Sequence, residues 1–311
     1  MRLGAGLEVG RLLVTRAFTT CGMAGLPIVL IMVTGKLDRA PVKSLSNQPQ
    51  HDVYVIAHQD DWQLFMGDIV VEGLRSTRTA TFVYLTAGDD GRDSSYWRTR
   101  EQAALASTRI AIGNPSISDR PVCAPALVHR HVIRRCLLGR TESYFLRLPD
   151  GRRNGAGYAS YGNQSMRRLR SRKISTITAV DGSAAYSGWG DLVASVAEIL
   201  GETGDAGSII HTTDPSVALN PHDHFDHRMA GLLVDELRMH SSSSVRYYEG
   251  YALGTRAANR TNVQAREKTE VFLAYDQEMT RVNNKWSAYR EHPSFYSSCM
   301  LRTYARTPRM R

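Results

Sequence analysis

The sequence feature that most constrains the fold is an apolar run, residues 53–56, that is followed at once by His58, Asp60 and Asp61. Consecutive apolar residues without polar alternation are typical of a strand that is covered on both faces, as in a parallel sheet. The three polar residues then come directly after the carboxyl end of that strand. Because ligands bind at this end in open α/β sheets, a functional site is expected there.

The segments that follow alternate between helix and strand patterns. Residues 62–74 have apolar side chains at helical spacing, residues 79–86 form a second apolar run, and residues 97–112 have an Ala-rich face typical of a helix. This order predicts right-handed crossovers. We therefore expect an α/β fold with a mostly parallel sheet and helices on both faces.

The rest of the chain continues this pattern with one interruption. Residues 151–188, rich in Gly, Ser, Arg and Tyr, show little periodicity, which is typical of a functional loop or an insertion. No linker after residue 51 requires a second domain, so we expect one domain at 52–311. The remaining predicted elements are strands at 126–133, 143–148 and 208–211, helices at 192–200 and 228–240, and a last strand and helix at 246–251 and 264–279.

Residues 1–51 are expected to be an extension that ends in a linker. Residues 22–33 form an apolar run behind several arginines, as in a signal peptide, but no clear cleavage site follows. The run is also shorter than the ~20 residues that a membrane-spanning helix needs. We expect export or a membrane tether. The alternatives are a non-native extension with Met23 as the true start, or an apolar helix packed on the domain.

The charge and the cysteines narrow the range of partners. A net charge of +9 favours anionic partners, but much of it comes from residues 167–173 and the basic C-terminus, which we interpret as a solvated loop and tail. No nucleic-acid-binding motif accompanies them, so no nucleic-acid partner is expected. Without a CxxC pair we expect no cysteine-bound metal, although Cys123 and Cys136 could form a disulfide in an exported protein. The sequence indicates no oligomeric state.

A second cluster of histidines and aspartates follows the predicted strand at 208–211. A catalytic zinc needs about three nitrogen or oxygen ligands and an open position for water. The metal lowers the pKa of that water to around 7, and a nearby free carboxylate can then take its proton. The two clusters together predict a metal site, with helix capping as the alternative role for Asp60 and Asp61. The second cluster consists of His222, Asp223, His224, Asp226 and His227.

Two other kinds of site lack their motifs. No GxSxG sequence is present to form the nucleophile elbow of a serine hydrolase. No GxGxxG sequence opens the first helix, so the glycines that would bring the backbone close to a pyrophosphate are missing.

Five motifs together resemble the PIG-L or LmbE-like N-acetylglucosaminyl deacetylases. They are AHQDD, LTAGDDG, RTREQAALA, LPDG and HFDH, in that order, and the resemblance covers about residues 50–280. It implies a Rossmann-like α/β fold. It also implies a zinc-dependent hydrolase that removes the acetyl group from an N-acetylglucosaminyl conjugate, such as a glycolipid, a thiol precursor or an antibiotic glycoside.

The resemblance also implies roles for individual residues. By motif position, His58, Asp61 and His227 would bind Zn²⁺, or another divalent metal such as Fe²⁺. Asp60 would be the general base that activates the water, and His224 would polarise or protonate the tetrahedral intermediate.

Supporting roles follow from the same comparison. Asp226 would orient a ligand imidazole, whereas His222 and Asp223 have no place in the motif. Arg98 and Glu101 match the start of the family's helix, and would either brace the sugar pocket or form a surface ion pair.

The chain departs from the family pattern at Gln59, where proline is usual, and at Trp62, where glutamate is usual. Trp62 is a candidate platform for a sugar face, with helix packing as the alternative. Neither change removes a predicted ligand, but they leave open an amidase or deacylase acting on another N-acyl or O-acyl group, or a non-catalytic sugar-binding protein. Residues 151–188 are a candidate lid or rim of the pocket.

Overall fold

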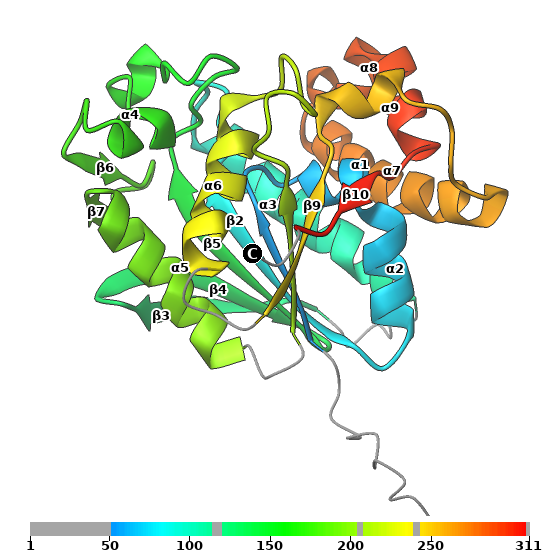
Figure 1. Ribbon diagram of the computed structural model, residues 1–311, viewed down its shortest axis with the longest axis horizontal. Helices are drawn as coiled ribbons and strands as arrows, with labels where there is room; N and C mark the ends of the chain where they lie inside the picture. Colours follow the sequence, from blue (N-terminus) through cyan, green and yellow to red (C-terminus); the bar gives the residue numbers. More distant parts are fainter. Residues whose placement is uncertain (1–50, 114–119, 204–207, 239–242, 309–311) are drawn as a thin grey trace, which may run out of the picture. The chain divides into compact units, whose positions relative to one another are not determined.

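A mixed sheet of eight strands forms the centre of the described part of the chain (Figure 1), with the strand order β10-β9-β8-β1-β2-β5-β4-β3. The computed structural model describes residues 51–113, 120–203, 208–238 and 243–308. Its strands are β1 (His51–Ile56), β2 (Thr79–Thr86), β3 (Val122–Val128), β4 (His131–Leu138), β5 (Thr141–Leu148), β8 (Ile209–Thr213), β9 (Ser244–Tyr248) and β10 (Ala305–Arg306), with a separate pair, β6 (Thr176–Thr178) and β7 (Ala185–Ser187).

Strand β1 lies inside the sheet, between β8 and β2. It pairs in parallel with β2 on one side and β8 on the other, and the parallel pairing continues to β5 and β9. Among the described strands of this sheet, the antiparallel pairs are β3 with β4, β4 with β5, and β9 with β10. The predicted mostly parallel sheet is confirmed, and β1 with β8 forms the switch point at which open α/β sheets bind ligands.

Helices cover both faces of the sheet, as predicted (Figure 1). Successive side chains of a strand point to opposite faces. Val53 and Val55 therefore pack against one group of helices, and Tyr54 and Ile56 against the other. The helices are α1 (Asp61–Phe65), α2 (Gly67–Arg75), α3 (Ser94–Ile112), α4 (Met166–Arg170), α5 (Trp189–Thr203), α6 (Phe225–Arg238), α7 (Asn262–Val282), α8 (Ala288–Glu291) and α9 (Pro293–Met300), with 3-10 turns η1 (Ala159–Tyr161), η2 (Tyr251–Thr255) and η3 (Asn284–Trp286).

Two predicted elements are wrong in detail. Residues 62–74 form two helices rather than one, and the break falls at Met66. Helix α7 packs closely against the next residue, because a Cβ added at Gly67 would lie 3.1 Å from Cγ of Lys268. Residues 126–133 are not one strand, because they contain the end of β3, a hairpin turn at residues 129–130 and the start of β4. His129 and Arg130 make that turn with φ angles of 45° and 73°, and neither is a residue type that usually signals one.

The chain does not end in the strand and helix that were predicted to be last. After α7 it forms η3, α8 and α9, and β10 then pairs with β9. Lys268 fixes this C-terminal segment, because its fully buried Nζ donates hydrogen bonds to the backbone oxygens of Cys299 and Arg302 and to the hydroxyl of Thr303.

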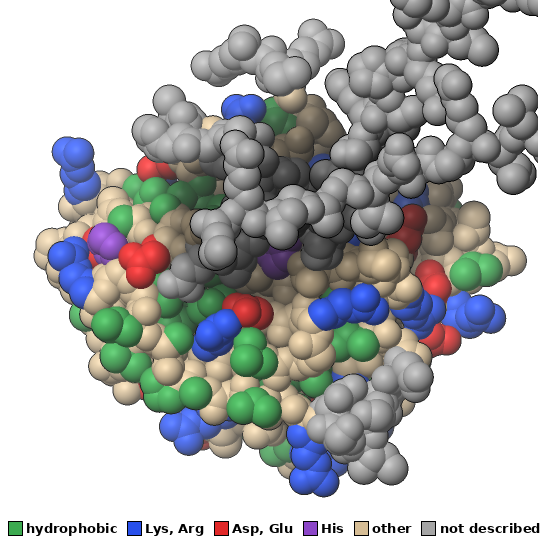
Figure 2. Space-filling model, turned by 90° about the horizontal axis from the view of Figure 1, so that it is seen from below, with side chains coloured by type: hydrophobic (Ala, Val, Ile, Leu, Met, Phe, Trp, Pro, Cys, Tyr) green, Lys and Arg blue, Asp and Glu red, His purple; other side chains and the backbone are tan. Residues whose placement is uncertain are grey.

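The region predicted as an insertion, residues 151–188, contains η1, α4, β6 and β7. Its basic run is solvent-exposed in large part, as predicted, but it is not all loop, because residues 166–170 form α4 and two of its arginines pack on aromatic rings. Arg167 lies over Phe225 at 4.3 Å, and Arg170 lies over Trp189 at 5.8 Å. Figure 2 shows one face of the molecule, on which described basic side chains are interspersed with apolar and acidic ones.

Cys123 and Cys136 form a disulfide between β3 and β4, where they are directly opposite in the pairing register. The bond therefore ties the outermost hairpin of the sheet together. The predicted N-terminal extension, with its apolar run, lies outside the described residues. Among the helices that the structure describes, none has both the length and the apolar character to cross a bilayer.

Candidate active site

The loops that follow β1 and β8 bring the two histidine–aspartate clusters together. Nδ1 of His58 lies 3.2 Å from Nε2 of His227, although the residues are 169 positions apart. Oδ1 of Asp61 lies 3.0 Å from the same nitrogen of His227 and 3.4 Å from Nδ1 of His58. All three side chains are buried. Because β1 and β8 are parallel neighbours, the residues that follow them meet at one edge of the sheet.

These three atoms fit the donor set of a divalent metal. Two imidazole nitrogens and one carboxylate oxygen are ordinary zinc ligands, and bonds of about 2.0–2.2 Å place neighbouring ligands of a tetrahedral ion roughly 3.3 Å apart. The observed separations of 3.0–3.4 Å are of that size. The predicted ligands His58, Asp61 and His227 are therefore brought together in an arrangement that could hold a metal.

Neither aspartate after β1 acts as a helix cap. Oδ2 of Asp61 accepts the backbone N–H groups of Ala57 and His58, at 3.0 and 2.8 Å, which leaves Oδ1 facing the imidazoles. Asp60 is the N-cap residue of α1, but its side chain makes no capping hydrogen bond. Its carboxylate accepts a hydrogen bond from Arg100 instead, and it lines the cavity described below.

Asp223 is the residue that orients His227, a role that the sequence comparison did not assign to it. Its Oδ1 lies 2.9 Å from Nδ1 of His227 and also accepts the backbone N–H of Tyr251 at 3.1 Å. A carboxylate on the far nitrogen of a ligand histidine fixes the ring and raises its basicity. The far nitrogen of His227 is thus held by Asp223.

Asp226 lies beside the other imidazole. Its Oδ2 is 3.6 Å from Nε2 of His58 and accepts the backbone N–H of Gly151 at 2.7 Å. Only a glycine permits this approach, because a Cβ at Gly151 would lie 2.5 Å from Oδ1 of Asp226. His222 takes no part in this network through its side chain in the described contacts; its backbone oxygen accepts hydrogen bonds from Arg153.

The charges of the three ligand-type groups stabilise one another. Burial opposes the charged form of each, but the imidazoles of His227 and His58 outweigh it and hold the pKa of Asp61 well below its ordinary value. Against the same burial, the carboxylates of Asp61 and Asp223 raise the pKa of His227 to about 10. The pKa of His58 is raised in the same way, chiefly by Asp61. The site therefore favours positive charge between its carboxylates.

A second group of ligand-type atoms lies on the other side of His58 and comprises His58, Asp150, His224 and Asp226. Asp150 was not predicted, although it belongs to the LPDG motif, which could have indicated it. Burial, together with the carboxylates of Asp226 and Asp89, raises the pKa of Asp150 to about 7, against the opposing effect of His58.

His224 is held as a neutral imidazole. Burial, with the positive charge of His58 and His227, lowers its pKa well below the ordinary value. Its Nδ1 accepts the backbone N–H of Asp226 at 3.2 Å, so the proton of the neutral ring is on Nε2. That nitrogen faces Asp150, 3.6 Å from its Oδ1, and His224 lines the cavity. The ring can therefore donate a hydrogen bond into the cavity.

Arg100 is a second site residue that the sequence did not reveal. Besides its contact with Asp60, the buried guanidinium donates to the backbone oxygen of Gly88 at 2.9 Å and to the hydroxyl of Tyr275 at 2.7 Å. Three partners from three segments fix its position. Arg100 belongs to the RTREQAALA motif, which could have indicated it, but the sequence comparison assigned roles to Arg98 and Glu101 instead.

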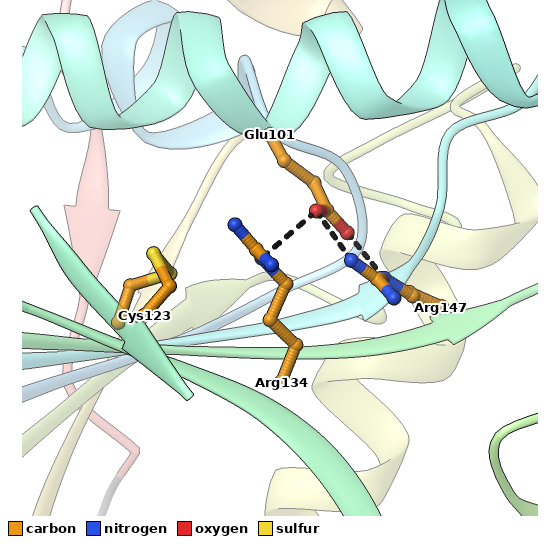
Figure 3. The surroundings of a disulfide bond; sticks show 5 residues. Glu101, Cys123, Arg134 and Arg147 are labelled. Carbon is orange, nitrogen blue, oxygen red and sulfur yellow. Dashed lines mark hydrogen bonds and ion pairs between the residues drawn. A yellow bond between two sulfur atoms is a disulfide. The ribbon is translucent and has the colours of Figure 1, made fainter. Parts of the chain in front are cut away.

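Three of the predicted supporting residues do not line the cavity. Trp62 is fully buried in the core and donates its indole N–H to the hydroxyl of Tyr84 at 3.0 Å, as the helix-packing alternative requires. Glu101 is buried and paired with Arg147 at 2.6 Å and Arg134 at 3.4 Å (Figure 3). Arg98 is exposed and lies over the ring of Trp97.

Gln59 connects the site loop to the neighbouring strand. Its fully buried amide donates a hydrogen bond to the backbone oxygen of Thr86, at the end of β2, with a distance of 2.8 Å. Glutamine thus ties the loop after β1 in place by a hydrogen bond, at a position where the family usually has the rigid ring of proline.

A cavity of about 640 Å³ opens next to these residues. Its lining combines polar and aromatic side chains, with walls that include α3 and the segment after α7. The polar lining includes His58, Asp60, Arg100, Asp150 and His224, and the aromatic lining includes Tyr96, Tyr251, Tyr275, Trp286, Phe295 and Tyr296.

A family model described as "PIG-L: GlcNAc-PI de-N-acetylase" matches residues 53–237, which is more than half of the chain. A search of curated protein sequences found no match.

Several solved structures are similar in fold. One is the 4-carboxy-2-hydroxymuconate hydratase GalB from Pseudomonas putida KT2440 (13% identity, 80% of this chain and 83% of that one, TM-score 0.41). Another is the N,N'-diacetylchitobiose deacetylase from Pyrococcus horikoshii (14% identity, 83% of this chain and 82% of that one, TM-score 0.41). A third is a deacetylase of the teicoplanin biosynthesis pathway (12% identity, 83% of this chain and 96% of that one, TM-score 0.44). Similarity at this level supports no conclusion about activity.

Proposed function

The chain belongs to the PIG-L family of GlcNAc-PI de-N-acetylases, and from this premise we propose that it is a metal-dependent hydrolase that removes the acetyl group from an N-acetylglucosaminyl conjugate. The observation that supports the proposal most directly is the convergence of His58, Asp61 and His227 beside a cavity of substrate size. The substrate is a small molecule that enters this cavity.

In this proposal the metal ligands are Nδ1 of His58, Oδ1 of Asp61 and Nε2 of His227, and the metal is Zn²⁺ or another divalent ion such as Fe²⁺. When bound, the ion supplies Lewis-acid polarisation of the amide carbonyl and a water activated near neutral pH. Asp223 keeps the imidazole of His227 in the orientation that presents Nε2 to the ion.

Asp60 takes the proton of the attacking water. Asp60 lies between the proposed ligands His58 and Asp61 in the sequence and lines the cavity. Arg100 holds its carboxylate in one orientation. A positioned general base accelerates such a step by roughly 10²–10⁴-fold. His224 is neutral and has its proton on Nε2. It either donates a hydrogen bond to the carbonyl oxygen that gains negative charge, or it gives its proton to the departing amine.

The test is acetate release from a panel of N-acetylglucosaminides by the purified, zinc-loaded protein. We expect turnover in the wild type, and a loss of about 10²–10⁴-fold in kcat with unchanged zinc content in the Asp60→Ala variant. A near-normal rate in that variant would refute the role of Asp60. If only other N-acyl or O-acyl compounds release their acyl group, the protein is a different amidase or deacylase. If it binds zinc and sugar without turnover, it is a non-catalytic relative.

We also propose that the protein works in an oxidising compartment, either exported or tethered to a membrane. The disulfide between Cys123 and Cys136 supports this location, because such bonds persist outside the reducing cytosol. The protein should therefore be recovered from extracytoplasmic fractions with both thiols protected from alkylation until a reductant is added. Recovery in the cytosol with both thiols reactive would contradict the proposal.

A further inference from the structure

We propose that an aromatic wall of the cavity selects N-acetylglucosaminides whose sugar carries a neutral aromatic aglycone; this rests on the proposed deacetylase function. The aromatic wall is defined as Tyr96, Trp286, Phe295 and Tyr296. Three of these residues follow α7 and lie outside residues 53–237, which the family model matches.

The wall is continuous with the candidate metal site through ring contacts. The ring of His227 is 5.1 Å from Tyr251, Tyr251 is 5.5 Å from Phe295, and Phe295 is 5.2 Å from Tyr296, all in edge-to-face geometry. His58, Tyr251, Phe295 and Tyr296 all line the cavity, so a ligand whose acetamido group lies at His58 extends along aromatic side chains. These rings are themselves good partners for a further ring, which prefers offset or edge-to-face contacts.

The cavity is large enough for such an extension. A volume of about 640 Å³ lies within the range of pockets that bury drug-sized ligands, which are larger than one monosaccharide. Trp286, Phe295 and Tyr296 are only partly buried, so their rings retain exposed surface that a ligand could cover.

The charges of the cavity favour a neutral aglycone over an anionic one. Each arginine that lines it already has a partner: Arg92 pairs with Asp90 at 3.1 Å, Arg153 donates to the backbone oxygen of His222 at 2.9 Å, and Arg100 binds Asp60. The lining also includes carboxylates, among them Glu291. A phosphate group would have to displace these contacts, whereas an aromatic ring would not.

The wall is held in place before a ligand arrives. Asp276 of α7 accepts hydrogen bonds from the hydroxyl of Ser287 at 2.8 Å and from the backbone N–H of Tyr289 at 3.2 Å, directly after Trp286. Trp286 also packs on Tyr96 at 5.2 Å between ring centres. Such preorganisation lowers the entropy that binding would otherwise cost.

The experiment measures kcat and KM for acetate release from the methyl, hexyl, 2-naphthyl and 2-phosphoethyl β-N-acetylglucosaminides. In the zinc-loaded wild type we expect the KM for the naphthyl glycoside to be about tenfold below that for the methyl glycoside, as expected for roughly 1.4 kcal/mol of ring contact. In Trp286→Ala and Phe295→Ala this ratio should fall to about two or less, with kcat/KM for the methyl glycoside within twofold of wild type.

Matched variants separate selection from damage to the fold. Trp286→Phe should restore most of the naphthyl preference, and Tyr289→Ala, an exposed aromatic on the adjacent α8, should leave it unchanged. An unaltered preference in both alanine variants, or a wild-type preference for the hexyl or phosphoethyl glycoside, would overturn the inference. If a variant unfolds, the comparison of Trp286→Phe with wild type, and calorimetric binding of the glycosides to wild type, still decide.

Failure of the proposed function gives a different result. In that case no glycoside releases acetate, but calorimetry still shows tighter binding of the naphthyl than of the methyl glycoside, and Trp286→Ala abolishes the difference. If neither turnover nor selective binding occurs, both proposals fail.

Discussion

Asp223 and Asp226 lie within four residues of His227, but their carboxylates contact different imidazoles. Asp223 holds Nδ1 of His227 at 2.9 Å, and Asp226 lies 3.6 Å from Nε2 of His58. The two residues have the same chemistry and neighbouring positions in the sequence. Their roles differ because Asp223 precedes α6, whereas Asp226 lies in its first turn and faces Gly151.

The residue-scale prediction concerns this support of the ligand. Asp223→Ala should weaken zinc binding by about 10–100-fold, because the imidazole of His227 loses the carboxylate that fixes its orientation and basicity. Competition with a chromophoric chelator measures the change. His222→Asn is the matched control, since asparagine tolerates the φ of 62° at this exposed position and the residue makes no described side-chain contact with the site. Equal affinities in Asp223→Ala and wild type would contradict the assignment.

At the scale of elements, the central strands are joined by a buried charge cluster at the end remote from the site. Asp52 of β1 binds Arg78 before β2 and lies 3.1 Å from Nε2 of His211 in β8. Burial would raise the pKa of Asp52, but hydrogen bonds with His211 and Arg78 outweigh it and lower the pKa to about 2. The cluster thus connects the same strands that carry the site loops.

This cluster predicts a pH dependence of stability. The folded-state pKa of Asp52 is about 2, below its ordinary value of 3.8, so its contribution is complete above about pH 4 and is lost as the pH falls through about 2. The shift corresponds to roughly 2 kcal/mol. Urea unfolding from pH 6 to pH 2 should show a smaller loss of stability in Asp52→Asn than in wild type. Glu267→Gln, which removes the partner of the half-exposed Arg75, should follow the wild-type curve.

The outer hairpin gives a second prediction for an element. Replacing both Cys123 and Cys136 with serine should lower the free energy of unfolding by about 2–3 kcal/mol, because the bond closes a loop with a sequence separation of 13. Urea unfolding with and without a reductant checks this. The reductant should destabilise the wild type by the same amount and leave the double serine variant unchanged. A wild type insensitive to complete reduction would show that the hairpin needs no crosslink.

At the scale of the whole molecule, the site joins segments from both sides of the switch point. A metal bound by the loops after β1 and β8 therefore stabilises the fold as a whole, by about 2.7 kcal/mol at a concentration of 100 times Kd. Zinc should raise the Tm of the wild type, and His227→Ala should lose most of this shift. His292→Ala removes an exposed histidine at the cavity wall and should keep it. An equal rise in Tm for His227→Ala would place the bound zinc elsewhere.

Much of the architecture could be predicted from the sequence because it depends on local patterns. The apolar runs at residues 53–56 and 79–86 correspond to β1 and β2, and the Ala-rich segment corresponds to α3. The turn at His129 and Arg130 and the helices after α7 were not predicted, since the turn lacks Gly or Asn and the short C-terminal helices have weak periodicity.

The sequence by itself determined the location of the candidate site and the residues that converge there. His58, Asp61 and His227 each follow a strand whose apolar character is visible in the sequence, and parallel strands place such residues at one edge of the sheet. This convergence follows from topology, and topology follows from the order of local patterns.

Only the tertiary structure decided which neighbours these residues have. Asp223 holds His227, Arg100 binds Asp60, and Trp62 lies in the core. The aromatic wall likewise depends on the packing of α9 against α1 and α7. The physical reason is that a hydrogen bond or a ring contact depends on side-chain directions within a few ångströms, which the packing of distant segments sets and which local sequence periodicity does not encode.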